Sequence, residues 1–334
     1  GPPRRRMSRQ ARGLLARALD RRAPLREDGR TTAFRWINGA ADGFPALTLD
    51  LFGDVGVLST YDETDSTPVA DAAMELLPLR AVYGKARPRE AGRLRGEERA
   101  ARAPPRPLRG EPVEGLEVRE QGLRFLVRPG EGLAVGLYLD MREARGWVRS
   151  HSRGRTLLNC FAYTGAFAVA ARAGGAARAV DVDLSRRSLR WAGENAALND
   201  QSPPPGDRLS GDVFDWLRRL GRKGERFDAV VLDPPGFARG KTGTFSASRD
   251  WPRLVAEAAP LVEPGGWLLA ACNVASLGAR RFEAALAEGV RRAGRTAEEV
   301  ARPDASPVDF PVGRGEEAPL KVRVLRLGVL TSRR

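Results

Sequence analysis

The residues best suited to chemistry lie where apolar segments of the sequence end. One such place is the turn from Asn159 to Gly165 (NCFAYTG), which closes the apolar run that begins at Thr156. A glycine in this turn lets the backbone approach a ligand at the carboxyl end of a parallel strand, where open α/β sheets bind cofactors. Asp183 ends the next apolar run, near the offset of about 20 residues at which an acid meets ribose hydroxyls. Together these residues indicate a cofactor that contains adenosine.

The same turn lacks the Gly-x-Gly-x-x-Gly pattern that seats a pyrophosphate against a helix N-terminus, which disfavours a nicotinamide or flavin dinucleotide. S-adenosyl-L-methionine has no phosphate and does not need that pattern. Asp212 opens the segment GDVFDWL after a further predicted strand and suits the adenine amino group. The alternative is that Asp212 caps the following helix, and the two roles are compatible.

A third strand end has the sequence Leu232-Asp-Pro-Pro-Gly-Phe237. Two consecutive prolines fix a rigid, non-helical exit that can hold Asp233 and nearby carbonyl groups toward a planar base. The alternative is an ordinary turn that ends a strand. The upstream cofactor elements favour the functional interpretation, because independent features then indicate one architecture.

The pattern from Thr156 onward predicts the elements that position these residues. Apolar strands are expected at TLLNCF, ARAVDVDLS, FDAVVLDPP, GGWLLAACN and KVRVLRLGVL, with helical segments between them. This alternation implies a doubly wound, Rossmann-like α/β domain with a mixed, mostly parallel sheet. The acidic residues would then lie along the carboxyl edge of the sheet.

The first part of the chain has a different pattern. Residues 4–22 place leucines on one stripe of a helix among many arginines, and residues 34–62 alternate apolar residues with turns, which is typical of short antiparallel strands. Residues 88–112 contain almost no large apolar side chains, so we expect an exposed loop or linker there. The expected domains are a basic helix at 1–30, a small α+β domain with an Arg/Pro-rich linker at 31–112, and the Rossmann-like domain at 113–334.

Composition restricts the partners and the compartment. The formal net charge of +14 favours a polyanionic partner such as RNA, through phosphate neutralisation. Cys160 and Cys272 are too distant in sequence to suggest a disulfide framework or a cysteine-rich metal site, so we expect a reducing cytoplasm and no metal. No apolar run reaches the roughly 18 residues of a membrane span, and no signal peptide is recognisable. The single histidine, His151, is interpreted as a solvated loop residue.

From about Thr31 onward the chain resembles the bacterial 23S ribosomal RNA large-subunit methyltransferases whose catalytic domain is shared by a guanine-N7 enzyme and a cytosine-5 enzyme. The matching stretches are, in order, FRWINGAADGFPALTLDLFGD, GLYLDMREAR, LLNCFAYTGAFAVAA, AVDVDLSRRSL, FDAVVLDPPGFARGK and EPGGWLLAACN. The resemblance implies S-adenosyl-L-methionine as methyl donor, 23S rRNA or a large-subunit precursor as partner, and a small domain ahead of the Rossmann-like one. It does not extend to the N-terminal RNA-binding PUA domain of some members.

The expected site residues come from the strand ends and from the matching stretches. The cofactor-binding residues are expected to be Tyr138, Asp140, Arg142, Asn159, Phe161, Tyr163, Thr164, Gly165, Asp183, Leu184, Asp212, Val213 and Asp233. The catalytic residues are expected to be Asp233, Pro234, Pro235 and Asn273, and the RNA-binding residues Phe237, Arg239 and Lys241. Tyr163 or Phe237 can stack on an extruded base, with core packing as the alternative. The loop at 238–250 is expected to hold phosphate backbone, with a mobile surface loop as the alternative.

The end of the strand GGWLLAACN bears on which atom is methylated. Cytosine C5 requires a thiolate that adds to C6, and Cys272 is the candidate. In the similar cytosine enzymes this strand runs to a Ser-Cys-Ser end, and alignment on Gly265-Gly266 puts Asn273 in the place of that cysteine. A slip of one residue turns a strand side chain to the other face. The guanine-N7 relatives have consecutive asparagines here, and N7 has a lone pair that can attack the methyl group directly.

The sequence therefore favours guanine N7, with cytosine C5 methylation through Cys272 as the alternative. Two further alternatives belong to other classes: a non-catalytic RNA-binding or ribosome-assembly factor, and a small-molecule methyltransferase. Asp183, Asp212 and Asp233 argue against the first of these, and the surplus of positive charge argues against the second.

Overall fold

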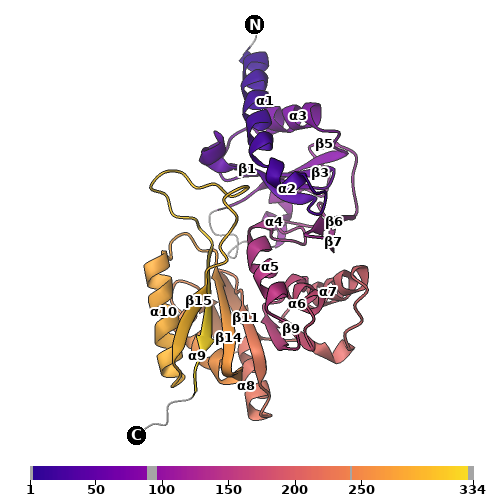
Figure 1. The fold of residues 1–334 in the computed structure, drawn as a ribbon. Helices are drawn as coiled ribbons and strands as arrows, with labels where there is room; N and C mark the ends of the chain where they lie inside the picture. The colour runs from indigo at the N-terminus through magenta and orange to yellow at the C-terminus, as the bar shows by residue number, and fades with distance from the viewer. Residues whose placement is uncertain (1–2, 89–95, 241–242, 330–334) are drawn as a thin grey trace. The chain divides into compact units, whose positions relative to one another are not determined.

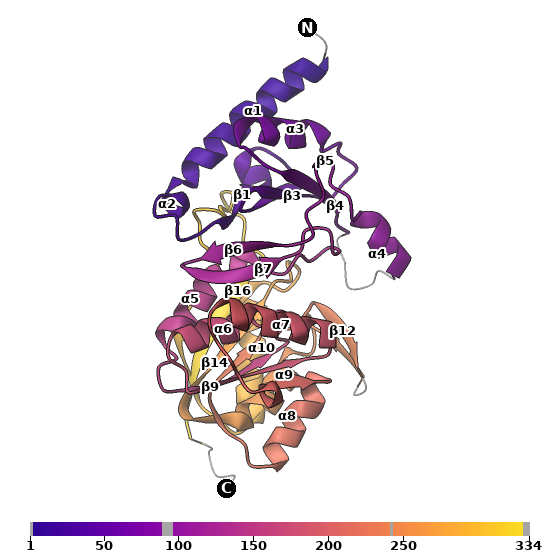
Figure 2. The ribbon, with the colours of Figure 1, turned by 90° about the vertical axis from the view of Figure 1, so that its right-hand side faces the viewer.

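The computed structural model describes residues 3–88, 96–240 and 243–329, and these residues divide into two units. The first unit comprises Gly1–Leu139 together with Ser306–Glu316, and the second comprises Asp140–Ala305 together with Glu317–Arg334. Figures 1 and 2 trace the chain through both. Within the described residues, no helix is long and apolar enough to cross a membrane.

The first unit contains a five-stranded sheet of order β1-β2-β3-β4-β5. Its neighbours are antiparallel except β3 and β4, which are parallel and are joined through helix α3. Antiparallel strands are the arrangement that the alternating pattern in this region predicts. The elements are α1 (Pro3–Arg21), α2 (Ala23–Arg26), β1 (Ala33–Asn38), η1 (Gly39–Asp42), β2 (Leu47–Phe52), β3 (Val55–Thr60), α3 (Thr67–Leu76), β4 (Ala81–Ala86), α4 (Gly96–Arg102), β5 (Arg109–Gly110), β6 (Leu116–Glu120) and β7 (Leu123–Val127).

Helix α1 belongs to the first unit because its apolar stripe is buried there. Leu15 and Ala18 are fully buried in a cluster that also contains Trp36 of β1 and Val69 of α3. The indole of Trp36 donates a hydrogen bond to the Leu15 carbonyl at 2.9 Å. Helices α1 and α3 lie side by side in both ribbon views (Figures 1 and 2). Burial of this stripe, rather than helix propensity, holds α1 in place.

A distant segment completes the first unit. Arg22 is fully buried and pairs with Asp42 through two contacts of 2.7 and 2.6 Å. The same guanidinium reaches the carbonyl of Asp309, and the Asp309 carboxylate accepts the backbone N–H of Arg35 at 3.1 Å. Because a buried arginine needs several acceptors, this network ties residues 306–316 to the first unit.

The boundaries in the structure differ from those expected from the sequence. The hairpin of β6 and β7 and the chain as far as Leu139 lie in the first unit, whereas the sequence placed the boundary at residue 112. The expected linker at 88–112 is not all loop in its described part, because it forms helix α4 and the edge strand β5. Strand β5 pairs with β4, and the Leu108 N–H donates to the Val82 carbonyl at 2.8 Å. Backbone pairing therefore orders a stretch that has few apolar side chains.

The second unit is built on a seven-stranded sheet of order β10-β9-β8-β11-β14-β16-β15. Strand β16 is antiparallel to both neighbours, and the other neighbouring strands in this sheet are parallel. The expected Rossmann-like fold with a mixed, mostly parallel sheet is confirmed. The elements are η3 (Leu139–Met141), α5 (Arg142–Ser150), β8 (Thr156–Cys160), α6 (Ala166–Ala173), β9 (Arg178–Asp183), α7 (Arg186–Leu198), η4 (Pro205–Asp207), β10 (Arg208–Ser210), α8 (Val213–Arg222), β11 (Phe227–Leu232), β12 (Phe237–Gly240), β13 (Gly243–Ser246), α9 (Trp251–Ala258), η5 (Ala259–Leu261), β14 (Val262–Cys272), α10 (Ala279–Arg292), β15 (Ala297–Ala301) and β16 (Lys321–Leu327).

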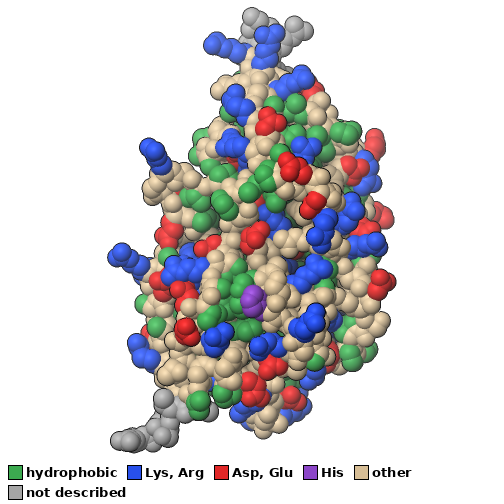
Figure 3. All heavy atoms as spheres, in the orientation of Figure 1, with side chains coloured by type: hydrophobic (Ala, Val, Ile, Leu, Met, Phe, Trp, Pro, Cys, Tyr) green, Lys and Arg blue, Asp and Glu red, His purple; other side chains and the backbone are tan. Residues whose placement is uncertain are grey.

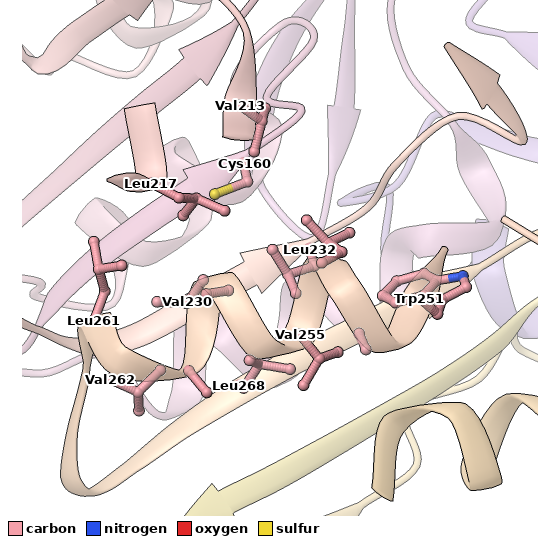
Figure 4. Packing of buried hydrophobic residues seen from close by; sticks show 14 of the residues in the cluster. Cys160, Val213, Leu217, Val230, Leu232, Trp251, Val255, Leu261, Val262 and Leu268 are labelled. Atoms are coloured by element: carbon pink, nitrogen blue, oxygen red, sulfur yellow. The ribbon is translucent and has the colours of Figure 1, made fainter. Parts of the chain in front are cut away.

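Two apolar clusters cover the two faces of this sheet. One contains residues of α8, α9 and α10 with Leu232, Ala270 and Cys272, and part of it is drawn in Figure 4. The other contains residues of α5 and α6 with Val231 and Ala271. Successive residues of one strand therefore enter opposite clusters, as the two-residue period of a strand requires. This alternation decides which side chains at the strand ends face which set of helices.

Candidate active site

The register of the central strands brings four chain segments to one edge of the sheet. Leu232, the last residue of β11, lies opposite Cys160 of β8 and Ala270 of β14, and Cys160 lies opposite Val182 of β9. The strand order reverses between β8 and β11, and such a switch point is where open α/β sheets bind ligands. The residues that follow these positions therefore form the candidate site.

The turn after β8 has a strained backbone. Phe161, Tyr163 and Gly165 have positive φ angles of 58°, 52° and 76°. For residues other than glycine this left-handed region is uncommon, and such strain clusters at functional sites. A Cβ built on Gly165 would lie 2.7 Å from the Ala192 Cβ and 3.1 Å from an Asp181 oxygen. Gly165 is therefore required both by its conformation and by the close approach of its neighbours.

Asp183 is fixed by two backbone N–H groups. Its Oδ2 accepts from Tyr163 at 2.8 Å and its Oδ1 accepts from Ser185 at 2.8 Å. Burial raises the pKa of Asp183, and the hydrogen bonds from Ser185 and Tyr163 oppose that shift. The next residue, Leu184, is 61% exposed, which is unusual for a large apolar side chain beside a half-buried carboxylate. The β9 end thus offers an oriented carboxylate next to an uncovered apolar surface.

Asp181 is a buried acid that sequence reasoning missed. It is 1% exposed and its Oδ1 accepts a hydrogen bond from Asn159 Nδ2 at 2.9 Å. Burial raises the pKa of Asp181 to about 6, with Arg172 and Asn159 opposing the shift. Asn159, expected to bind the cofactor, is itself 1% exposed and uses its amide to hold Asp181. Only the alternation of acids in AVDVD could have signalled this second carboxylate.

Other expected cofactor residues have different surroundings. Thr164 is 1% exposed, and its carbonyl accepts from the buried Asn195 amide at 2.9 Å, a contact that the sequence did not predict. Val213 is 5% exposed and belongs to the apolar cluster under α8. Arg142 is 2% exposed at the start of α5. Tyr138 is 48% exposed and belongs to the first unit, whereas the strand ends of the candidate site belong to the second.

Asp212 lies after β10 and caps helix α8. Its Oδ1 accepts the N–H of Asp215 at 3.1 Å, as the capping interpretation predicts. The backbone of Gly240 approaches the other carboxylate oxygen so closely that any Cβ at Gly240 would collide with it. Asp212 therefore lies under a strand of the segment that follows the Pro-Pro turn.

That segment is a hairpin, not the loop expected at 238–250. Strands β12 and β13 pair antiparallel, with Phe237 opposite Ser246. The Arg239 guanidinium lies 5.8 Å from the centre of the Phe237 ring, and Arg239 is exposed. Lys241 lies outside the described residues. Ala238 and Phe245 lie opposite each other on the two strands. Phe245 belongs to the apolar cluster under α8 and α9, and Ala238 packs against it, so both strands are held on that cluster.

Asp233 follows β11 and shares its surroundings with a second carboxylate. Burial is the main cause that raises the pKa of Asp233 to about 7; the charge of Asp140 raises it further and that of Arg145 opposes the shift. Asn273, the residue after β14, donates from Nδ2 to Asp140 Oδ2 at 3.3 Å. Pro234 is buried and Pro235 is exposed. Because the ring of each proline fixes its φ angle, the two residues together fix the direction in which the chain leaves the strand. Arg145, 3% exposed on α5, was not anticipated from the sequence.

Cys272 lies among apolar side chains, and of the two carboxylates only Asp233 is close enough for its charge to act on the thiol. Cys272 is 1% exposed and belongs to the apolar cluster on the α9 and α10 face, with Trp251, Leu254 and Phe282. Burial raises the pKa of the Cys272 thiol. Asn273, the next residue, is exposed. Within the described residues, no group of three or more His, Cys, Asp or Glu side chains could hold a metal ion.

His151 ends helix α5 and is exposed, as the interpretation of a solvated residue anticipates. Its ring stacks on Trp147 with centroids 3.9 Å apart, and Nδ1 lies 2.7 Å from the Trp147 carbonyl. The purple side chain is visible on the surface in Figure 3. We assign it no chemical role.

The strand order, the single antiparallel strand β16 and the acidic carboxyl edge together define a class I methyltransferase fold. Comparison with known proteins agrees. Residues 92–324 match the S-adenosylmethionine-dependent methyltransferase family. The chain therefore belongs to the family of S-adenosylmethionine-dependent methyltransferases.

Individual relatives carry related descriptions. A putative ribosomal RNA large subunit methyltransferase, YwbD, of Bacillus subtilis is 34% identical over 274 residues, which are 80% of this chain and 68% of that protein. The ribosomal RNA large subunit methyltransferase I of Aeromonas salmonicida is 33% identical over 288 residues, 85% of this chain and 72% of that protein. Among solved structures, SMU.776, a putative methyltransferase complexed with SAH, has a TM-score of 0.83 and 26% identity over 96% of this chain and 81% of that chain.

Proposed function

We propose that this protein methylates guanine N7 in large-subunit ribosomal RNA, with 23S rRNA or its precursor as substrate in the cytoplasm. One observation carries the choice of atom. The side chain at the end of β14 that lies beside the acidic pair Asp140 and Asp233 is Asn273, whereas Cys272 is buried among apolar side chains on the other face.

The donor-binding residues proposed here lie along the carboxyl edge of β8, β9 and β10. S-adenosylmethionine supplies the methyl group as a sulfonium when it is bound. Asp183 presents a carboxylate whose orientation is fixed by two backbone N–H groups, which suits the ribose hydroxyls. Leu184 offers an exposed apolar surface to the adenine ring, and Asp212 offers its carboxylate to the adenine amino group.

Cytosine C5 chemistry fits the chain poorly. That reaction requires a thiolate that reaches C6 of the base. A thiolate at Cys272 would be formed in an apolar cluster, where burial raises the pKa of the thiol. Guanine N7 needs no protein nucleophile, so catalysis requires alignment of its lone pair and recognition of the base.

The hydrogen-bonding edge of the base leads to the same choice. Guanine presents N1–H and two N2–H donors, which carboxylates can accept. Cytosine presents a single donor group, N4–H2, next to the acceptors N3 and O2, so one of two neighbouring carboxylates would face an acceptor and repel it. The acidic pair Asp140 and Asp233 therefore favours guanine.

Two observations support RNA as substrate. The net charge of +14 is far larger than a small-molecule substrate needs, and Figure 3 shows Lys and Arg side chains spread over the drawn face among fewer acidic ones. The relatives at 33% and 34% identity are described as ribosomal RNA large subunit methyltransferases. Within the site, Phe237 and Arg239 on the hairpin offer a ring and a cation to an extruded nucleotide.

The first prediction tests the target atom. Wild-type chain incubated with S-adenosylmethionine and unmodified 23S rRNA should produce 7-methylguanosine, and Cys272→Ser should retain its rate within about threefold, because a thiol outside the site takes no part in the reaction. Mass spectrometry of the digested nucleosides measures both. Appearance of 5-methylcytidine in the wild-type product, lost in Cys272→Ser, would overturn the assignment.

The second prediction tests the hairpin. Arg239→Gln should weaken RNA binding and lower the slope of log affinity against log salt by about 0.7 to 0.9, because one phosphate contact is lost. The matched control is Arg291→Gln, an exposed arginine in the last turns of α10, which should leave the slope unchanged. Fluorescence anisotropy with a labelled rRNA fragment at several salt concentrations gives the slopes. If both variants have the same slope of log affinity against log salt, Arg239 does not contact the RNA phosphates.

A further inference from the structure

Asp140 is fixed against the sheet of the second unit by its neighbours in the chain. It lies in the 3-10 turn η3, directly before helix α5. The following residue, Met141, is 3% exposed and packs in the cluster that contains Ala144 and Ala271. The Asn273 amide donates to Asp140 Oδ2 at 3.3 Å. Packing on one side and a hydrogen bond on the other therefore hold this carboxylate at the end of β14.

The alternation of the strands directs Asp233 toward the same side. Leu232 and Cys272 enter the cluster on the α9 and α10 face, whereas Val231 and Ala271 enter the cluster on the α5 face. The next residues of each strand, Asp233 and Asn273, continue the alternation toward α5. Asp140 precedes that helix and Arg145 is on it.

We propose that Asp140 is a specificity-determining residue that binds the target base together with Asp233, and not a ligand of the methyl donor. This inference rests on the proposed guanine-N7 activity, and it differs from the donor-binding role that the sequence led us to expect for Asp140. The two carboxylates divide the N1–H and N2–H donors of guanine between them. The Asn273 amide orients Asp140 by donating to its Oδ2.

The reaction itself explains why a second carboxylate is useful. N7 forms a bond to the methyl carbon with its lone pair, the carbon–sulfur bond breaks, and the electron pair of that bond stays on sulfur. No proton leaves N7, so the positive charge passes to the base. The N1–H and N2–H groups of the cationic base are stronger donors than those of guanine. Their hydrogen bonds to carboxylates therefore strengthen as the transition state forms, which is the condition for catalysis by binding.

The charges that face Asp233 agree with this role. They are Asp140 from η3 and Arg145 from α5, and the Cys272 thiol of β14 is close enough to Asp233 to interact with it. Asp140 also raises the pKa of Asp233, because two nearby carboxylates resist joint ionisation. The rate should therefore rise with pH as Asp233 loses its proton.

The test compares Asp140→Asn, Asp140→Glu and the control Asp200→Asn, which changes an exposed acid after α7. For Asp140→Asn we expect kcat for 7-methylguanosine to fall about 100-fold, the acid limb of the pH–rate profile to move to lower pH, and the SAH dissociation constant to stay within about threefold of wild type. Asp140→Glu keeps the charge, so its acid limb should stay near the wild-type position. Asp200→Asn should resemble wild type in all three measurements.

Other outcomes are equally informative. A large loss of SAH affinity in Asp140→Asn, with kcat kept at saturating donor, would show a donor ligand and overturn the inference. An acid limb that does not move in Asp140→Asn would also overturn it. Wild-type chain that binds SAH but yields no 7-methylguanosine would instead refute the proposed function. Thermal unfolding and SAH calorimetry show whether Asp140→Asn is misfolded. If it is, Asn273→Ala, which removes only the amide that orients Asp140, should lower kcat and leave the acid limb of the pH–rate profile in place. A wild-type kcat in Asn273→Ala contradicts the proposal.

Discussion

Asp233→Asn should reduce guanine methylation by about 1,000-fold or more while making the protein more stable at neutral pH. The activity falls because the carboxylate that accepts the donor edge of guanine is replaced by an amide, which presents N–H groups to those donors. Single-turnover methylation of rRNA with quantified 7-methylguanosine measures the loss. Retention of more than a tenth of the wild-type rate would exclude Asp233 from base recognition.

The stability gain follows from the raised pKa of Asp233, which burial and Asp140 move to about 7. A carboxylate whose pKa is higher in the folded chain than in the unfolded chain binds more protons when folded. Its contribution to stability is complete below about pH 4, the unfolded value, and is lost as the pH rises to about 7. At pH 8 the ionised side chain costs stability that asparagine does not, about 1 to 3 kcal/mol.

Thermal unfolding at two pH values checks this sign. Wild type and Asp233→Asn should have nearly equal midpoints near pH 4, and the variant should be higher at pH 8. Asp228→Asn is a poor control because Asp228 accepts hydrogen bonds from Thr156. Asp200, an exposed acid after α7, is suitable, and Asp200→Asn should show no such divergence. A variant of Asp233 that loses both activity and stability would indicate that the carboxylate is structural.

Much of the fold followed from the sequence because buried parallel strands leave a strong signal. The runs that end at Cys160, Asp183 and Leu232 are mainly apolar, and the structure forms β8, β9 and β11 there. The first unit was harder to delimit. The network of Arg22 with Asp42 and Asp309 joins residues far apart in the chain, and no local sequence pattern predicts such a pairing.

In the candidate site, too, some residues could be predicted from the sequence and others could not. The strand ends at Asp183 and Asp233 were predictable because an acid after an apolar run is conspicuous. The buried pair of Asn159 and Asp181 was not, since polar residues inside a strand read as interruptions until their partner is known. The face that Cys272 occupies depends on the register at the end of β14, and one residue decides it. Arg145 belongs to the matching stretch GLYLDMREAR, but the acid that it faces, Asp233, lies far away in the sequence, so its place in the site could not be predicted.

Asp183→Ala should weaken SAH binding about 10- to 100-fold, the effect expected when hydrogen bonds to a charged group are lost. Two consequences act together. The ribose hydroxyls lose an acceptor, and the N–H groups of Tyr163 and Ser185 lose the carboxylate that both donate to. Since Phe161 and Tyr163 have left-handed backbone conformations, the turn after β8 depends on that anchor to keep its shape.

Calorimetry with SAH measures the affinity, and Asp215→Ala is the matched control. Asp215 is in the first turn of α8, where its side chain is 48% exposed and faces Arg219 at 3.9 Å, so its loss should leave SAH binding unchanged. A separate readout distinguishes the two consequences for Asp183. If the turn loses its shape, Gly165→Ala, which forces a Cβ against Ala192, should show a similar loss of SAH affinity. If Asp183→Ala binds SAH as tightly as wild type, the donor does not bind at the carboxyl end of β9, and the assignment of that strand end is wrong.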